Sequence, residues 1–226
     1  MIYDVITLFP EIIQGYCRES ITKRGIEEGI ITVNTLNPRD FTHDKHKKVD
    51  DTPYGGGGGM VLMAQPIFDC YRSIERCENS AFLMMTPQGE RYSQKTAEEL
   101  SHYEQIIILC GHYEGFDERI RIGLAPREIS IGDYVLTGGE LGALVLIDSI
   151  SRNLKGYLGQ DICSHNDSFS SGLEGLLEYP HYTKPREYEG MRVPEILLSG
   201  NHKKIEEYRK QESIKKTRLK RPDILT

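Results

Sequence analysis

Short apolar runs that alternate with helix-like stretches constrain this fold more than any other feature of the chain. The runs at 81–86 (AFLMMT) and 105–110 (QIIILC) are continuous, which is typical of strands covered on both faces. Further strands are predicted at 2–9, 30–36 and 128–136, and helices at 10–29, 93–103 and 139–152, with Ser93 as a cap. This β-α alternation predicts an α/β fold whose parallel sheet carries helices on both faces.

A shift in composition near residue 160 predicts a second, smaller domain. The stretch 160–172 (QDICSHNDSFSSG) is polar and carries Ser, Asn and Gly, so we interpret it as a flexible interdomain linker. We expect domains at 1–159 and 173–226, the second one small and all-helical, with Ser199 or Asn201 as a helix cap.

Charge is distributed unevenly along the chain. The net charge is −6, yet residues 200–221 hold nine Lys or Arg and three Glu, a local balance of +6, which leaves −12 for the rest. A basic tail on an acidic body suits either an appendage that binds a polyanion or a solvated helix face.

Two classes of protein are disfavoured by composition. No run of about 18 apolar residues predicts a membrane span, and the N-terminal MIYDVITLFPEII lacks the pattern of a signal peptide. The five cysteines are an odd number without a CxxC pair, which favours reduced thiols in the cytosol over a zinc site or disulfides.

Three predicted strands run into glycine-containing loops: PQGER (87–91), GHYEGFDER (111–119) and TGGELG (137–142). Ligands of a parallel sheet bind beyond the carboxyl ends of its strands, so these loops predict one shared pocket with backbone walls. Neither GxGxxG nor GxxxxGK[ST] occurs, so the dinucleotide and phosphate-loop interpretations lack their motifs. The run of five glycines at 55–59 is either a flexible linker or a backbone that passes close to a ligand.

Several motifs in a fixed order resemble the bacterial tRNA (guanine-N1)-methyltransferase, or TrmD, family of the SPOUT class. They are PRDFTHDKH, DDTPYGGGGGM, CGHYEGFDER, SIGDYVLTGGE, DSISR, NDSF and PHYTKP, and the resemblance runs from Ile2 to about Leu225. It implies a deep trefoil knot in the α/β domain, S-adenosylmethionine as methyl donor, and a cytoplasmic homodimer whose active site is shared between subunits. The implied reaction is methylation of N1 of the guanosine at tRNA position 37, 3′ of the anticodon.

The resemblance also assigns residues to the two ligands. For the cofactor they are Met85, Thr86, Pro87, Gly111, Tyr113, Glu114, Gly115, Ile131, Gly132, Tyr134, Leu136, Gly138 and Gly139. For the substrate they are Asp50, Tyr54, Gly55, Gly56, Gly57 and Gly59. Glu114 could instead be a carboxylate at a helix N-terminus, and Asp50 could cap a turn.

The implied transfer needs a base for the N1 proton of guanine and a cation beside O6, where negative charge gathers. By resemblance Asp167 is the base and Arg152 the partner of O6. A free aspartate has a pKa of about 3.9 and is a weak base, so we expect Arg152 to make the guanine more acidic. Without the resemblance, Asp167 is interpreted as a solvated carboxylate of the linker. Arg152 is then a cation at a helix C-terminus, a position that the helix dipole favours.

Other ligands and activities stay open at this point. His43, Asp44 and His46 are close in sequence, but no zinc-type spacing repeats, so we expect no dedicated metal site and favour phosphate contact for 39–48. Magnesium is a further candidate cofactor without a site. The lysines and arginines of 203–221 are candidates for tRNA phosphates. Rival functions are a methyltransferase of ribose oxygens and a non-catalytic RNA-binding protein.

Overall fold

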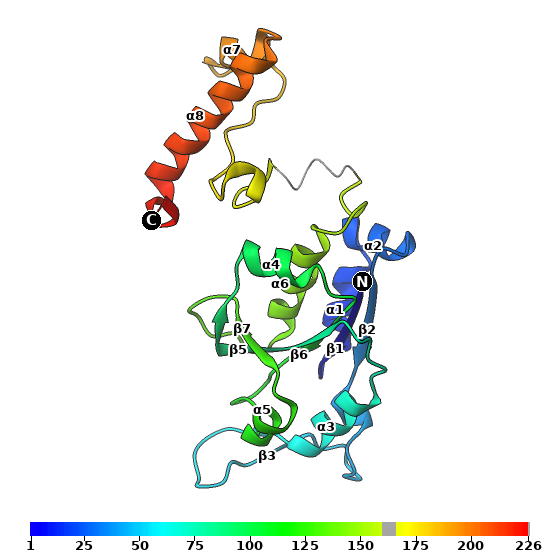
Figure 1. The fold of residues 1–226 in the computed structure, drawn as a ribbon. Helices are drawn as coiled ribbons and strands as arrows, with labels where there is room; N and C mark the ends of the chain where they lie inside the picture. Colours follow the sequence, from blue (N-terminus) through cyan, green and yellow to red (C-terminus); the bar gives the residue numbers. More distant parts are fainter. Residues whose placement is uncertain (160–165, 226) are drawn as a thin grey trace. The chain divides into compact units, whose positions relative to one another are not determined.

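The computed structural model describes residues 1–159 and 166–225 (Figure 1). The chain divides into two compact units, 1–159 and 160–226, which are described separately below. Residues 160–165 of the predicted linker 160–172, which include Cys163, lie outside the described residues. The other four cysteines are free thiols.

A five-stranded parallel sheet is the centre of the first unit. Its strand order is β2-β1-β6-β5-β7, and the strands are β1 (Ile2–Ile6), β2 (Thr32–Leu36), β5 (Ser80–Arg91), β6 (Gln105–Leu109) and β7 (Arg127–Ser130). All five residues of β6 are buried, as its continuous apolar run predicts. Strand β5 is longer than expected, because its pairing with β7 shifts between Met85 and Glu90 and resumes after the irregularity.

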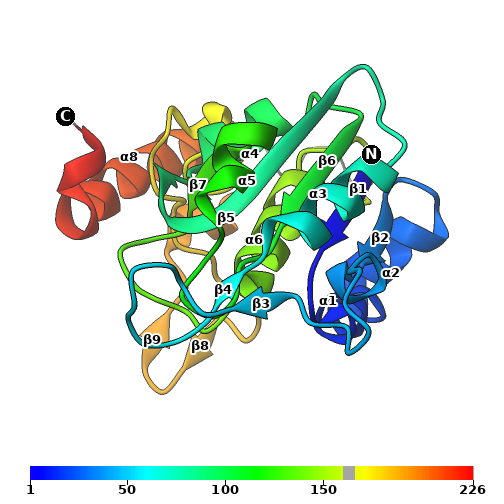
Figure 2. The same cartoon turned by 90° about the horizontal axis from the view of Figure 1, so that it is seen from below.

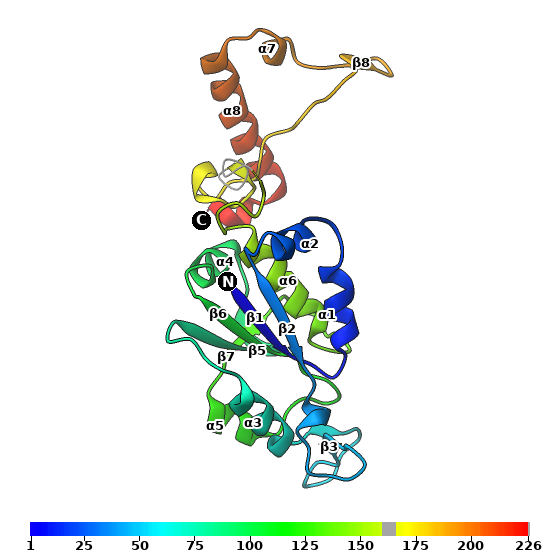
Figure 3. The ribbon, with the colours of Figure 1, turned by 90° about the vertical axis from the view of Figure 1, so that its right-hand side faces the viewer.

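Helices cover both faces of this sheet, which confirms the predicted arrangement (Figure 3). Buried residues of α1 (Pro10–Cys17), α4 (Gln94–Leu100) and α6 (Glu140–Ser151) share one apolar cluster with the sheet. Those of α3 (Ala64–Ser73) and α5 (Glu118–Leu124) share a second cluster. Ser93 caps α4 as expected, since its hydroxyl accepts a hydrogen bond from the Thr96 amide.

Three expectations for this unit need correction. The stretch 10–29 is two helices, α1 and α2 (Ser20–Glu27), because the chain turns between them and Ser20 adopts a φ of 53°. The strand expected at 128–136 ends at Ser130, because the Gly132 amide bonds back to the Ser130 hydroxyl. Helices α3 and α5 lie where no helix is predicted.

The segment that carries the glycine run is held at both ends. Strand β3 (Asp50–Asp51) pairs antiparallel with β4 (Val61–Leu62), and the 3-10 helix η1 (Pro38–Asp40) precedes them. Figure 2 shows β3 and β4 side by side with the glycine segment looping between them. A loop closed by a strand pair within one compact unit is not an interdomain linker.

The second unit contains η3 (Ser171–Leu173), β8 (Glu187–Tyr188), β9 (Met191–Arg192), α7 (Glu195–Leu198), α8 (His202–Lys220) and η4 (Pro222–Leu225). It is not all-helical, because β8 and β9 form an antiparallel hairpin. Glu189 and Gly190 both have positive φ, 49° and 77°, as a tight hairpin turn requires. Asn201 caps α8 by accepting from the Lys204 amide. Within the described ranges, no helix has the length and apolar character to cross a membrane.

Candidate cofactor pocket

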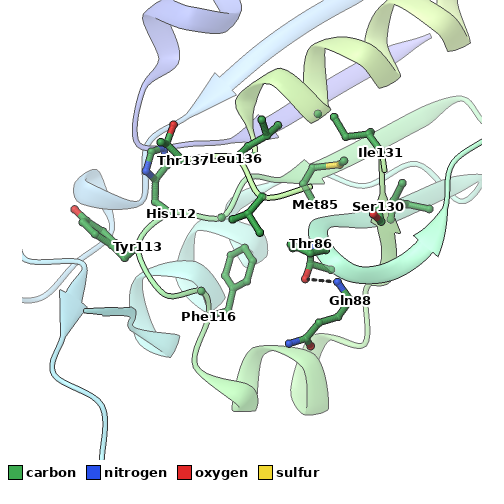
Figure 4. Close-up of a pocket in the computed structure, with 18 of the residues that line it drawn as sticks. Met85, Thr86, Gln88, His112, Tyr113, Phe116, Ser130, Ile131, Leu136 and Thr137 are labelled. Atoms are coloured by element: carbon green, nitrogen blue, oxygen red, sulfur yellow. Dashed lines mark hydrogen bonds between the residues drawn. The ribbon is translucent and has the colours of Figure 1, made fainter. Parts of the chain in front are cut away.

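A cavity of about 310 Å³ is lined by the irregular middle of β5, by the segment that follows β6, and by the end of β7 with the segment that follows it. Its walls are residues 85–88 of β5 and the glycine-containing segments that follow β6 and β7, and Figure 4 shows Met85, Phe116 and Ile131, one from each wall, around the same space. The stretch 87–91, expected to be a loop, is part of β5, and its Gly89 is not among the lining residues. The thirteen residues assigned to the cofactor by resemblance all line it: Met85, Thr86, Pro87, Gly111, Tyr113, Glu114, Gly115, Ile131, Gly132, Tyr134, Leu136, Gly138 and Gly139. The predicted shared pocket therefore exists.

Further lining residues were missed by the sequence reasoning. They are Gln88, His112, Phe116, Arg121, Ile129, Ser130, Val135, Thr137 and Gly142. Most of them lie inside or directly beside the quoted glycine loops, so the bounds of these loops in the sequence could have predicted them as lining residues. Arg121 is different, because it comes from helix α5, which no pattern predicts.

The loops are joined backbone to backbone at Gly139. Its amide donates to the Gly111 carbonyl oxygen at 2.8 Å. A Cβ at Gly139 would lie 2.8 Å from both the Cys110 Cα and the Gly111 nitrogen, closer than real Cβ atoms approach backbone. The loop after β7 can therefore lie against the end of β6 only because residue 139 has no side chain.

A buried carboxylate connects three segments behind this wall. Glu140, the first residue of α6, is 3% exposed. Its Oε1 accepts from the Thr7 hydroxyl at 2.6 Å, and its Oε2 is 3.0 Å from Nε2 of His112, a lining residue. The Thr7 hydroxyl in turn accepts from the Phe9 amide at 2.9 Å. A carboxylate so buried needs such partners, and its place in the first turn of α6 is favoured by the helix dipole.

Arg121, the cation among the residues that line the cavity, is already paired with carboxylates of the protein. Arg121 is bound by Glu128 and Glu118, each at 3.0 Å. Burial acts to lower the pKa of Arg121, but these two carboxylates raise it above its usual value. Asp117, not Glu114, caps α5, and its hydrogen bond from Arg119 lowers the pKa of that carboxyl. The alternative interpretation of Glu114 as a helix-terminal carboxylate is therefore wrong.

The glycine run lies beside this cavity without lining it. Gly55, Gly56, Gly57 and Gly59 have φ of 86°, 80°, 124° and 81°, a conformation that L side chains rarely adopt. A Cβ on Gly59 would lie 2.5 Å from Cγ of Glu114, and the Glu114 amide donates to the Met60 carbonyl oxygen at 2.9 Å. Asp50 is half-buried in β3, and Tyr54 is fully exposed. Backbone conformation accounts for Gly55, Gly56 and Gly57, and both backbone conformation and close packing account for Gly59, whereas nothing in the structure explains Gly58.

The two expected catalytic residues belong to different units. Arg152 is the half-buried C-cap of α6, and its amide donates to the Asp148 carbonyl oxygen at 3.1 Å. It does not line the cavity. Asp167 is half-buried in the second unit, where its carbonyl oxygen accepts from the Ser170 amide at 3.1 Å.

The cluster at 39–48 shows no metal-binding arrangement. Asp44 accepts the amides of His46 and Lys48, which lowers the pKa of its carboxyl, while His43 pairs with Asp69 at 3.3 Å. Across residues 1–159 and 166–225, no three His, Cys, Asp or Glu side chains come together as metal ligands would.

Comparison with known proteins decides the family. The model of the tRNA (guanine-1)-methyltransferase TrmD family matches residues 1–226. The chain is 54% identical to a tRNA (guanine-N(1)-)-methyltransferase of Clostridioides difficile over 99% of this chain and 97% of the relative. It is 55% identical to the enzyme of that name from Anoxybacillus flavithermus and 53% to that from Geobacillus kaustophilus, over 98% of this chain and 90% of each relative.

This chain belongs to the TrmD family. The resemblance drawn from ordered motifs is thereby confirmed, and the parallel sheet with helices on both faces agrees with it. Within this TrmD-family chain, the motifs CGHYEGFDER and SIGDYVLTGGE supply the walls of the cavity that follow β6 and β7.

Proposed function

We propose that this protein transfers the methyl group of S-adenosylmethionine to N1 of the guanosine at tRNA position 37, 3′ of the anticodon. The observation that carries the proposal is the convergence of all thirteen cofactor-assigned residues on one cavity in a chain of the TrmD family. The printed names of its relatives support the same substrate class and the same atom of guanine.

The cavity suits the proposed cofactor. Its volume of about 310 Å³ lies at the lower end of small-molecule sites, which span roughly 300–1,000 Å³. Its walls combine apolar side chains with backbone amides and carbonyls, which can read an adenine edge without charge. S-adenosylmethionine supplies an electrophilic methyl group when bound, and the loop residues hold and orient it.

Asp167 and Arg152 are the proposed catalytic pair. Guanine N1 carries a proton at neutral pH, and Asp167 accepts that proton as general base. Arg152 donates to O6, where the charge left behind gathers, and so makes N1 easier to deprotonate. The 3.9 pKa typical of a free aspartate is low for a base, so we assign the larger effect to Arg152.

A homodimer is the proposed assembly, with the cavity of one subunit completed by Asp167 of the other. Exposed apolar side chains on neighbouring helices α1 and α6 support it: Ile12 is 44%, Tyr16 39%, Leu141 56% and Val145 43% exposed. Burying such a surface against a second copy removes it from water. The cytoplasm is the proposed location.

The trefoil knot is likewise a proposal. Membership of the TrmD family supports it, since the resemblance to that family is what implies the knot. Magnesium, if the reaction needs it, has no assigned site. The basic residues of α8 are proposed to contact tRNA phosphates.

Mass spectrometry of tRNA tests the function. A tRNA with guanosine at positions 36 and 37 is incubated with the protein and S-adenosylmethionine, then digested. The expected product is N1-methylguanosine in the fragment that contains position 37. Methylation of a ribose, or of another nucleoside, would overturn the proposal, as would binding of tRNA without any transfer.

A further inference from the structure

A groove in the second unit has no role in the function proposed above. Its cavity measures about 630 Å³ and is formed by segment 179–186, helix α7 and the first turns of α8. Ile205 of α8, 9% exposed, is one of its apolar lining residues. The lining also includes four aromatic rings and three cations: Tyr179, His181, Tyr182, His202, Lys184, Arg186 and Arg209.

Two of the rings and one guanidinium pack against one another. Tyr179 and His181 have ring centroids 4.9 Å apart, and the Arg209 guanidinium lies 4.7 Å from the centroid of Tyr179. Tyr182 is 49% exposed, so much of its ring is open to solvent. A tilted ring contact with His181 and a cation–π contact with the Arg209 guanidinium hold Tyr179 in place, while the exposed ring of Tyr182 is left for a further flat group.

The cations of the groove differ from three other cations of the same unit, which are paired. Arg192, Lys210 and Arg221 are paired with carboxylates of Glu187, Glu174 and Asp223. Within 166–225 no carboxylate pairs with Lys184 or Arg186, and none of the lining residues is acidic, although Glu178 binds His181 from outside the lining. The groove therefore carries uncompensated positive charge on a protein whose net charge is −6.

We infer that this groove binds one unpaired nucleotide of the tRNA, with its base against Tyr182 and its phosphates at Lys184 and Arg186. Aromatic rings stack on bases of any sequence, and neighbouring cations hold the backbone, which is how single-stranded RNA is bound. A duplex is excluded, because its bases are stacked within the helix and present no free face. The inference rests on the proposed tRNA methylation, since it adds a binding subsite for that substrate.

Equilibrium binding to tRNA tests the groove independently of methyl transfer. Tyr182→Leu removes the ring and is expected to weaken tRNA binding about tenfold, while Tyr182→Phe keeps the ring and binds as the unaltered protein does. Arg186→Ala is expected to lower the slope of log affinity against log salt by about one. Arg192→Ala is the matched control, because Arg192 is exposed like Arg186 but is paired with Glu187, and it is expected to leave the slope unchanged.

A second measurement reports stacking itself. Fluorescence of a short single-stranded RNA containing 2-aminopurine is expected to fall on binding to the unaltered protein and to Tyr182→Phe, but not to Tyr182→Leu. An unchanged affinity for S-adenosylmethionine in every variant shows that the first unit is intact. An unchanged helical signal in circular dichroism shows that α8 is intact.

The inference is overturned if Tyr182→Leu binds tRNA like the unaltered protein, or if duplex RNA competes as well as single-stranded RNA. Should Tyr182→Leu fail to fold, an unchanged salt slope in Arg186→Ala overturns it alone. Failure of the proposed function has a different signature, namely full binding and quenching without methyl transfer.

Discussion

At the scale of single residues, Glu140 shows how a side chain outside the ligand cavity can determine its shape. Its carboxylate binds Thr7 at the end of β1 and His112 in the loop after β6, while its backbone begins α6. Both partners are buried or partly buried, so water cannot replace a lost bond without rearrangement.

Glu140→Ala is expected to reduce the free energy of unfolding by about 1–3 kcal/mol, because it leaves the Thr7 hydroxyl without its acceptor and opens a gap beside His112. Urea denaturation followed by circular dichroism measures it. Glu11→Ala is the matched control: Glu11 also lies in the first turn of a helix but is exposed, so a change within about 0.5 kcal/mol is expected. Equal effects of the two substitutions would contradict the role of Glu140.

Asp167→Asn is expected to slow methyl transfer by about 10²–10⁴-fold, because the amide cannot accept the N1 proton. S-adenosylmethionine affinity, measured by calorimetry, is expected to stay unchanged, since the proposed role of Asp167 is toward the guanine and not toward the cofactor. Arg152→Ala is expected to slow transfer by about 10²–10³-fold through loss of charge stabilisation at O6. A parallel loss of rate and cofactor affinity would indicate a structural role instead.

At the scale of elements, the cavity depends on how closely the segments after β6 and β7 approach each other and the middle of β5. Gly139 lies against the Cys110–Gly111 backbone, and Gly142, one turn into α6, lies against the Met85 side chain. The absence of side chains at these positions allows α6 to begin directly behind the cavity wall.

Gly139→Ala is expected to destabilise the protein by about 1–3 kcal/mol and to weaken S-adenosylmethionine binding, since backbone on one side of the contact must shift. Thermal unfolding and calorimetry measure the two effects. Gly15→Ala in α1 is the control: it has open space around it, so we expect stability to rise by up to about 1 kcal/mol through helix propensity. Full cofactor affinity in Gly139→Ala would exclude this contact as a determinant of the pocket.

At the scale of the whole molecule, exposed apolar side chains occur together on the neighbouring helices α1 and α6 of the first unit. They lie on the sheet face that α4 also covers, and α1 and α6 are direct neighbours. The proposed homodimer buries them, and it is also what brings Asp167 of one subunit to the cavity of the other.

Val145→Glu is therefore expected to convert the dimer to monomer, because a carboxylate cannot be buried in that interface without a partner. Sedimentation velocity measures the change, and methyl transfer is expected to fall with it. Ile122→Glu is the control, because it places the same charge on α5, whose buried residues lie on the opposite face of the sheet. Ile122 is 76% exposed, so this substitution is expected to leave the dimer intact. A dimer that survives Val145→Glu would place the interface elsewhere.

Local patterns in the sequence determined the class of fold and the site's location. Continuous apolar runs specify buried strands such as β6 without reference to the rest of the chain, and Ser93 and Asn201 cap helices through bonds that span three residues. Glycines after successive strands indicated a pocket, since the carboxyl ends of parallel strands meet at one edge.

Only the tertiary structure decided which residues meet across long separations. Thr7 and Glu140 are 133 residues apart, so no local pattern pairs them, and the groove between segment 179–186 and α8 likewise needs both elements in place. The hairpin β8–β9, the early end of β7 and the break between α1 and α2 depend on single turn residues. The periodicity of apolar residues indicates which face of a helix or strand is buried. Contacts between residues far apart in the sequence depend on how the elements are placed in space, and a short-range sequence pattern carries no information on that placement.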